Sequence, residues 1–345
     1  MDRTEFVCDL AFPEQRLSCP KAIETFGSVE MAPSRRRITS DHDWLEKHLR
    51  PLMAKGREIQ AIDATLPSSL PVYEKGYWTG LKLILVRYYM PGYLNILSPR
   101  TKVAYIDLFA GPGLNLIGDG RVPVPGSPLL PSAMEGTVHQ FSSFILCEKR
   151  EDYARAVRTR LGKFVPQDRL RIHQGDANEF IDELPEILAE RDIGHSLVFI
   201  DPEGMEFKCD ALARLLDTVS CDVIINFPSA GLVRNLTTGD NATLATIRGF
   251  LGLSARATLP ASEEEAIQWY RSKLASLGKD ISTEIVVSAG DVPFHYHLIP
   301  AVRKTKGGSD WFRILTTAKE RIERLAGDVV GIVSAQIDGR LGVLR

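Results

Sequence analysis

The sequence lacks several features that mark exported, membrane-bound or broadly nucleic-acid-binding proteins. Its first ten residues show no basic start followed by an apolar core, so we expect no secretory signal. No uncharged apolar run approaches the length of a membrane span. The 42 basic and 44 acidic residues nearly cancel, which excludes a general basic field for nucleic acid but leaves local patches open. We therefore expect a cytoplasmic protein without membrane contact.

Cysteine is also scarce, with five residues scattered through the chain, an odd number and no C-x-x-C pair. This pattern favours reduced thiols and argues against a disulfide framework or a zinc site. Cys147 and Cys221 adjoin predicted strands, where a thiol acts as a small core residue. His295 and His297 alternate in an apolar run and share one face, but metal sites recruit a third ligand nearby. We expect no metal.

What the chain does contain is organised around residues 103–113, V-A-Y-I-D-L-F-A-G-P-G. The apolar run, broken only by Asp107, predicts a buried strand, and Gly111 and Gly113 allow a sharp turn and close approach to a ligand. A dinucleotide fingerprint would need glycine at Leu116 and a helix opening directly from the turn to hold a pyrophosphate. A cofactor without phosphates, such as S-adenosylmethionine, needs only the close approach. A tight turn that binds nothing is the alternative.

Four further apolar strands follow, separated by amphipathic segments. They are predicted at residues 143–148, 170–176, 196–201 and 222–226. Nearly continuous apolar strands that alternate with helices predict a mostly parallel sheet covered on both faces. The sequence therefore predicts an α/β protein with a Rossmann-like, doubly wound sheet.

Changes in pattern along the chain divide it into five predicted regions. They are a poorly ordered tail (1–37), an N-terminal helical segment (38–100), the α/β core (101–236), an inserted helical cap (237–280), and a final region (281–345) that completes the sheet and ends in a helix and a hairpin. A capping signature opens the first helix at 39–41, residues 73–97 have helical spacing, and Asp338-Gly339 is a hairpin signal. Residues 114–126 form a long loop that we expect to close over a cofactor as a lid.

Each predicted parallel strand carries a functional side chain at or near the same end. These residues are Asp107, Glu148, Asp176, Asp201 and Asn226. Ligands of open α/β sheets bind outside the carboxyl ends of the strands, so the five should converge on one crevice. One such residue means little because Asp and Asn favour turns, but five in strand order indicate a site.

The cofactor roles follow from the chemistry of S-adenosylmethionine. Glu148 is placed to accept hydrogen bonds from both ribose hydroxyls, and Asp176 from the adenine amine, with Ala177 supplying a backbone N–H. The glycine turn lies under the methionine portion, and we expect Asp107 and Phe109 of the same motif to complete the cofactor site. Helix N-capping is the alternative role for Glu148 and Asp176.

The catalytic roles fall on the fourth and fifth strands. Asp201 is the candidate base that accepts the proton of the methyl acceptor, and Asn226 would orient that acceptor through its amide. Pro202, Phe227 and Lys82 are the candidate substrate-binding residues, with the Phe227 ring available to stack on a base.

An ordered set of motifs adds a resemblance to a known family. The set is Trp78…Lys82, D-L-F-A-G-P-G (107–113), G-S-P-L-L (126–130), G-D-A-N (175–178), I-D-P-E-G (200–204) and I-N-F-P (225–228). It resembles the three-Cys-motif partner proteins (TcmP) of the class I S-adenosylmethionine-dependent methyltransferase superfamily, over residues 40–320. The resemblance implies a methyltransferase-like fold, S-adenosylmethionine as cofactor, and a bacterial gene pair whose other product carries the cysteine motif. It does not identify the substrate.

Three alternatives remain open. Methyltransferases that act on base amines resemble one another in a [D/N/S]-P-P-[Y/F] motif. Residues 201–204 of this chain, D-P-E-G, match only its first two positions, so nucleic acid stays one candidate substrate. The E-x-K at 206–208, with Asp201 before it, resembles metal-dependent nucleases, although their acids normally lie on separate strands. A non-catalytic binding module in a two-protein system is the third, because fold does not imply function.

Overall fold

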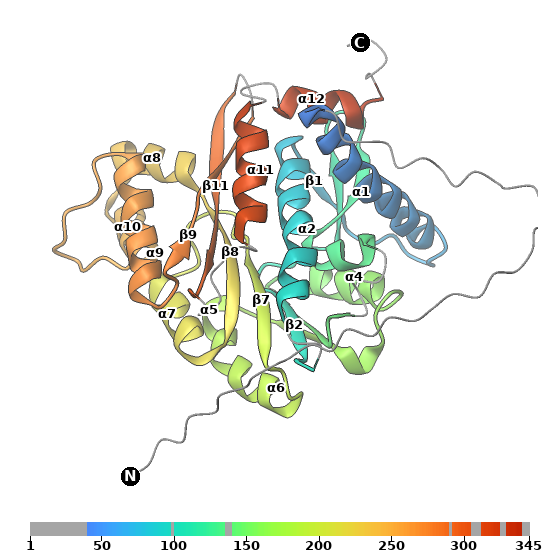
Figure 1. The fold of residues 1–345 in the computed structure, drawn as a ribbon, viewed down its shortest axis with the longest axis horizontal. Coiled ribbons are helices and arrows are strands. Elements are labelled where there is room, and N and C mark those ends of the chain that lie inside the picture. The colour runs from blue at the N-terminus through green and yellow to red at the C-terminus, as the bar shows by residue number, and fades with distance from the viewer. Residues whose placement is uncertain are drawn as a thin grey trace, which may run out of the picture. The chain divides into compact units, whose positions relative to one another are not determined.

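A mostly parallel sheet forms the centre of the protein (Figure 1). The computed structural model describes residues 40–97, 100–134, 140–289, 292–304, 312–324 and 329–339. Within them the sheet order is β10-β11-β8-β7-β2-β5-β6, with β9 beside β11. The strands are β2 (Val103–Asp107), β5 (Ser143–Glu148), β6 (Leu170–Gln174), β7 (His195–Ile200), β8 (Cys221–Phe227), β9 (Ile281–Ser282), β10 (Ile285–Ala289) and β11 (Val292–Val302).

The five predicted strands take the spatial order 3-2-1-4-5, and all neighbours among them are parallel. The motif strand β2 lies at the centre, between β5 and β7. After the fifth strand the sheet continues with β11, which runs antiparallel to both β8 and β10. The Rossmann-like, doubly wound class predicted from the sequence is confirmed, because order reversal beside the first strand defines such sheets.

Each face of the sheet carries its own hydrophobic core, because successive side chains of a strand point to opposite faces. Val103 and Tyr105 of β2 belong to one core, and Ala104 and Ile106 to the other. The first core includes α1 (Asp41–Asp63), α2 (Trp78–Ile96), α4 (Glu151–Leu161), α11 (Arg313–Arg324) and α12 (Val329–Ile337). The second includes α5 (Ala177–Phe180), α6 (Leu184–Glu190), α7 (Cys209–Thr218), α8 (Ser229–Thr238), α9 (Asn241–Leu251) and α10 (Glu263–Ser276).

The predicted regions meet this layout in different ways. The described residues all belong to one compact unit, whereas the predicted tail 1–37 lies outside the described residues. The helical insertion is present as α9 and α10, but its apolar residues, such as Ile247 and Tyr270, pack in the second core. It therefore extends a helix layer of the sheet. No helix in the described ranges is both long and apolar enough to cross a membrane.

The N-terminal helical segment begins as predicted and then departs from the prediction. Ser40 caps α1, its Oγ accepting the Asp43 N–H at 3.1 Å. The helix expected over 73–97 starts only at Trp78, because residues 73–75 form strand β1 (Tyr73–Lys75). Pro91 lies inside α2 and does not end it.

The expected lid over residues 114–126 is wrong. The chain forms a hairpin of β3 (Leu114–Ile117) and β4 (Val122–Pro125), and β1 adds to β3 in parallel. Its apolar side chains, including Leu114, Ile117 and Val124, are buried, and α1 approaches so closely that a Cβ on Gly56 would overlap the backbone of Pro123. A hairpin held in the core cannot open as a loop does. The turn after it leads into the 3₁₀ segment Ser127–Ala133.

The expected C-terminal hairpin is also wrong in its first arm, while residues 340–345 fall outside the described ranges. Residues 329–337 form α12, and Ile332, Val333 and Ile337 are buried in the first core. The Asp338-Gly339 signal ends this helix: Gly339 has φ +70°, and the Asp338 carboxylate accepts the Tyr77 hydroxyl at 3.0 Å. Helical spacing of apolar residues outweighed the local turn signal.

The side chain of Arg160 joins several of these parts. It extends from α4, is fully buried, and donates to both carboxylate oxygens of Asp63 at the end of α1. It also donates to the carbonyl oxygens of Pro71 at 2.8 Å and Pro112 at 2.6 Å. One guanidinium thus connects α1, the segment before β1 and the glycine turn.

This network gives the first testable prediction. Arg160→Met should lower the free energy of unfolding by about 3 kcal/mol, because it leaves the Asp63 carboxylate and two carbonyls without their partner. Urea unfolding followed by circular dichroism measures the change. Arg155→Met, at an exposed position of the same helix, is the matched control and should stay within about 0.5 kcal/mol of the wild type. Equal effects of the two substitutions would contradict the assigned role.

Candidate functional site

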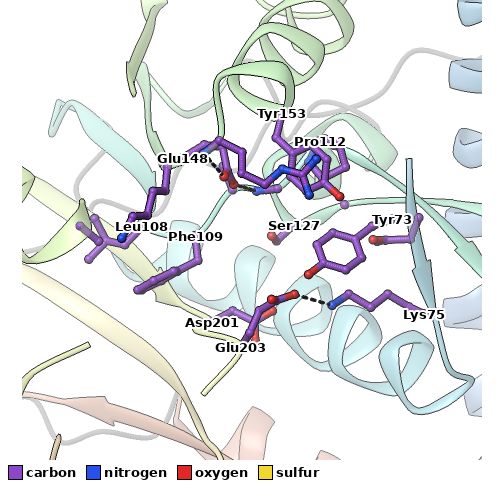
Figure 2. A pocket seen from close by; sticks show the side chains of 18 of the residues that line it. Tyr73, Lys75, Leu108, Phe109, Pro112, Ser127, Glu148, Tyr153, Asp201 and Glu203 are labelled. Atoms are coloured by element: carbon purple, nitrogen blue, oxygen red, sulfur yellow. Dashed lines mark hydrogen bonds and ion pairs between the residues drawn. The ribbon is translucent and has the colours of Figure 1, made fainter. Parts of the chain in front are cut away.

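A cavity of about 280 Å³ opens at the carboxyl ends of β2, β5, β6 and β7 (Figure 2). The sheet supplies its floor through residues 108–113, 148–150, 175–177 and 201, and Glu203 and Glu206 follow from the loop after β7. The opposite wall comes from β1 and α2, with Tyr73, Lys75 and Lys82 among its residues. This is the crevice at which open α/β sheets bind ligands.

The glycine turn presents its backbone to this cavity. Gly111 and Gly113 have φ values of +61° and +85°, a region that favours glycine. A Cβ on Gly113 would lie 2.7 Å from Leu129 Cδ1, and the Gly126 N–H donates to the Gly113 carbonyl oxygen at 2.8 Å. The chain then enters β3, so no helix begins at the turn. The turn offers close backbone approach but not the helix N-terminus that a pyrophosphate requires.

Glu148, at the end of β5, is held by two backbone groups. Its Oε2 accepts the Gly111 N–H at 2.7 Å and its Oε1 accepts the Arg150 N–H at 2.8 Å. Each carboxylate oxygen offers about two lone-pair sites, so each keeps one for a ligand. Two acceptors side by side suit a vicinal diol. The same carboxylate occupies the turn N–H that a phosphate would otherwise approach, and it would repel an anion there.

Asp176 is both a helix cap and a wall of the cavity. Its Oδ1 accepts from the backbone and side-chain N–H groups of Asn178 at 2.9 and 2.8 Å, so the capping alternative is confirmed for this residue. Burial acts to raise the pKa of Asp176, but the Asn178 hydrogen bonds outweigh it and the pKa is lowered. The second oxygen lies 3.5 Å from Lys149 Nζ. Ala177, which follows, also lines the cavity.

Asp201 and Lys82 form an ion pair at the cavity floor. Lys82 Nζ donates to the two carboxylate oxygens at 2.9 and 2.6 Å, and the Asn226 side-chain amide donates to Oδ1 at 2.8 Å. The side chains of Lys82 and Asp201 are only 11% and 16% exposed. The structure therefore brings together three residues that the sequence assigned to catalysis and substrate. The candidate base thus accepts two hydrogen bonds at Oδ1 and one at Oδ2, which leaves one lone pair on Oδ2.

Four of the predicted site residues do not face the cavity. Asp107 is fully buried beneath the turn, where its Oδ1 accepts the Phe109 N–H at 3.2 Å. Pro202 is buried, and the Oδ1 of Asn226 is buried without a hydrogen-bond partner among the described residues. The Phe227 ring is fully buried against Phe250 and Tyr270, at centroid distances of 5.4 and 5.3 Å. The predicted stacking of a base on Phe227 is therefore wrong. Phe109, Gly111, Gly113, Glu148, Asp176, Ala177, Asp201 and Lys82 do line the cavity.

The structure adds lining residues that the sequence reasoning missed. Tyr73 and Tyr153 place their rings 5.6 Å apart, and the Arg150 guanidinium lies 3.8 Å from the centre of the Tyr153 ring. Lys75 Nζ lies 3.5 Å from the centre of the Tyr73 ring. Because the spacing of apolar residues predicted one helix over 73–97, the sequence did not show that residues 73–75 form a strand that reaches the cavity. No local signal marks these positions, because a separate small sheet brings them to the cavity.

Two other sequence candidates have structural roles. Glu206, of the nuclease-like E-x-K, accepts the N–H groups of Glu203 and Gly204 at 2.8 Å with its two oxygens, so both are committed to shaping one loop. His295 and His297 lie close together, as predicted, and contact the Glu263 carboxylate at 2.8 and 3.3 Å. That cluster ties α10 to β11 and does not line the cavity.

Comparison with known proteins finds matches among solved structures, all of those described below at low sequence identity. No protein-family model matches the chain, and no curated protein matches it. Among solved structures it is similar to a Legionella pneumophila protein (13% identity, TM-score 0.41, 70% of this chain and 91% of that one). It is also similar to Trm1 from Pyrococcus horikoshii in complex with S-adenosyl-L-methionine (14% identity, TM-score 0.38, 67% of this chain and 58% of that one). A third similar structure is an O-methyltransferase from Bacillus cereus in complex with SAH (12% identity, TM-score 0.34, 74% of this chain and 100% of that one). We base the function proposed below on the site's own residues.

Asp107 gives a prediction of pH dependence. Burial raises its pKa from 3.8 to about 7, against the opposing effects of Ser127 and the Phe109 N–H. The folded protein therefore holds this proton more tightly than the unfolded chain, and the associated stability is lost as the pH rises from about 4 to about 7. The free energy of unfolding of the wild type, minus that of Asp107→Asn, should fall over this range and then level.

Urea unfolding at a series of pH values measures this difference. Asp222, whose pKa burial raises to about 6, contributes equally to both proteins and cancels. A difference that does not change between pH 4 and pH 7 would contradict the prediction.

Proposed function

We propose that the chain is an S-adenosylmethionine-dependent methyltransferase whose cofactor binds in the cavity at the ends of β2, β5 and β6. The observation that carries the proposal is the position of Glu148. Two backbone N–H groups hold its carboxylate beside the positive-φ turn, and one lone pair on each oxygen remains for a ribose diol. The residues present fit a nucleoside cofactor that has a diol and carries no phosphate.

Other lining residues support the remaining parts of this cofactor. Ala177 offers a backbone N–H toward an adenine ring, and Asp176 offers its second carboxylate oxygen, which Lys149 Nζ contacts at 3.5 Å. The turn at Gly111 and Gly113 can lie against the methionine portion. Phe109 borders the same space. When bound, this cofactor supplies an electrophilic methyl group on a sulfonium cation, a charge that the nearby carboxylates favour.

The acceptor side of the site is formed by Asp201 and Lys82, with Asn226 outside the cavity lining and bonded to Asp201. Asp201 accepts three hydrogen bonds from the other two, which holds the Lys82 ammonium in one place on the cavity floor. An ammonium group has three N–H donors, and two are used on Asp201. The third can orient an acceptor atom toward the methyl group. Within the proposal these residues position the acceptor, which supplies much of the rate in such reactions.

The partner and the acceptor class rest on the sequence alone. The motif resemblance supports a protein with a three-Cys motif as partner, in a bacterial two-protein system, and the partly matching 201–204 motif keeps nucleic acid among the substrates to test. A non-catalytic module is favoured by one observation, the engagement of Asp201 by Lys82 and Asn226. Turnover assays should therefore be run with and without the partner.

The cofactor hypothesis is tested by calorimetric titration. The wild type should bind S-adenosylmethionine or its demethylated product, and Glu148→Gln should weaken binding by roughly 10- to 100-fold, because an amide nitrogen replaces one charged acceptor. Glu190→Gln, at an exposed position of α6, is the matched control and should bind like the wild type. No heat with the wild type at millimolar ligand, or equal affinity in Glu148→Gln, would exclude this site.

Asp201→Asn separates an enzyme from a binding module. The change keeps the shape but removes the charge that anchors Lys82, so transfer should fall at least about 100-fold while cofactor affinity is retained. The melting temperature should fall, because the largely buried Lys82 ammonium loses its charged partner, so the assay is run below it. The assay offers labelled methyl donor to total RNA, DNA, protein and small-molecule extracts. Undiminished transfer by the variant would contradict the assigned role. A wild type that binds cofactor tightly and transfers to no pool would favour the module.

A further inference from the structure

We propose that Lys75 is the proton acceptor of this site and that the methyl acceptor is a hydroxyl group. The inference rests on the proposed methyltransferase function and names its substrate class and a further catalytic residue. Methyl transfer to a hydroxyl releases a proton, which a group facing the cavity must accept.

The carboxylates that line the cavity are largely committed to other groups. Both oxygens of Asp201 accept from Lys82, both of Glu148 accept backbone N–H groups, and both of Glu206 accept the loop N–H groups. Asp176 caps a helix at the adenine side, and the Glu203 side chain is 68% exposed to solvent. Asp201 keeps one lone pair on Oδ2, but a proton taken up there would remove the charge that pairs with Lys82. The other carboxylates lie off the acceptor side or are committed to backbone N–H groups.

Lys75 has the required position. It extends from β1 toward Asp201 and Glu203 across the cavity (Figure 2), and its side chain is 28% exposed. Its Nζ lies 3.5 Å from the centre of the Tyr73 ring and 3.4 Å from Oε1 of Glu203. The strand that carries it is held by pairing with β3, where Lys75 faces Ile117 in register. The amine is therefore placed on a rigid element beside the Lys82–Asp201 pair.

The surroundings of Lys75 also adjust its proton affinity. Burial, followed by the like charge of Lys82 on α2, lowers the pKa of Lys75 to about 8, and Asp201 acts in the opposite direction. Glu203 faces the amine too, but solvent screens this long, exposed pair. From the hairpin side, Arg121 pairs with Glu74. A base is most effective when its pKa lies near the working pH, and a buried lysine can meet that condition.

The polarity of the acceptor side favours a hydroxyl over an amine. A primary amine must donate its N–H groups to acceptors, yet Asp201 keeps only one lone pair and the Asn226 Oδ1 is buried. Lys82, which has one N–H beyond the two on Asp201, and the Lys75 amine both line the cavity there. A hydroxyl oxygen can accept from Lys82 while its proton points to Lys75.

The step balances without any further reagent. The Lys75 lone pair takes the hydroxyl proton, the oxygen forms a bond to the methyl carbon, and the carbon–sulfur bond breaks with its electron pair left on sulfur. The products are a methyl ether, a neutral thioether and a Lys75 ammonium that returns its proton to water.

The first arm of the test needs no substrate. Competitive labelling of amines with acetic anhydride across a pH series, read by mass spectrometry, gives the titration midpoint of Lys75, with the half-exposed Lys102 as internal reference. We expect a midpoint near pH 8, slower labelling when S-adenosylhomocysteine is bound, and an upward shift in Lys82→Met, which removes the like charge. A midpoint above pH 10, as for an ordinary lysine, would overturn the inference.

The second arm measures transfer from labelled S-adenosylmethionine to total RNA and to a small-molecule extract. Lys75→Met and Lys75→Arg should bind S-adenosylhomocysteine normally but lose on the order of 10²–10⁴-fold in turnover, because neither side chain takes up a proton at neutral pH. A small primary amine added to Lys75→Ala should restore part of the rate. Lys102→Met is the control and should retain full activity.

The outcomes separate this inference from the proposed function. Absence of S-adenosylhomocysteine binding by the wild type would overturn the methyltransferase proposal, and the inference with it. Normal binding with an ordinary Lys75 midpoint, or full turnover in both Lys75 variants, would overturn the inference alone. A methylamine product in place of a methyl ether would overturn the hydroxyl assignment and leave the methyltransferase standing.

Discussion

The buried guanidinium of Arg160 is the interaction on which the geometry of the cavity depends. It binds the carboxylate of Asp63 and the carbonyl oxygens of Pro71 and Pro112, so it fixes the end of α1, the start of β1 and the glycine turn relative to one another. A charge with no exposed surface is tolerated only when its donors are satisfied, and this requirement makes the three segments interdependent. The two walls of the cavity are set by the same side chain.

The small sheet β1-β3-β4 supplies part of the cavity wall opposite the main sheet. In the simplest doubly wound unit a helix follows the first glycine turn, whereas here a hairpin follows it and recruits residues 73–75 as a third strand. That pairing carries Tyr73 and Lys75 to the cavity and, with α2, places Lys82 opposite the ends of β2 and β7. The wall is part of the hydrophobic core, so it is preorganised before any ligand binds.

Charge pairing gives the cavity two chemically different sides. On the cofactor side, carboxylates held by backbone N–H groups leave acceptor lone pairs at Glu148 and Asp176. On the other side Asp201 accepts hydrogen bonds from Lys82 and Asn226. The amine groups of Lys75 and Lys82 line the space where an acceptor would lie. Beneath both sides, the buried Asp107, with its pKa raised to about 7, is only partly ionised near neutral pH. One face accepts hydrogen bonds and the other donates them.

The sequence by itself determined the five parallel strands, the doubly wound class and the row of polar residues at the strand ends, because these depend on local apolar runs and on their alternation with helices. It also identified Lys82, Asp201 and Asn226, although not the hydrogen bonds that commit Asp201. Only the tertiary structure decided the rest. Tyr73 and Lys75 reach the cavity through pairing with a distant hairpin, Phe227 is withdrawn into the core, and residues 329–337 become a helix because α1 and α2 bury them. Each of these outcomes depends on contacts between segments far apart in the chain, which no local pattern encodes.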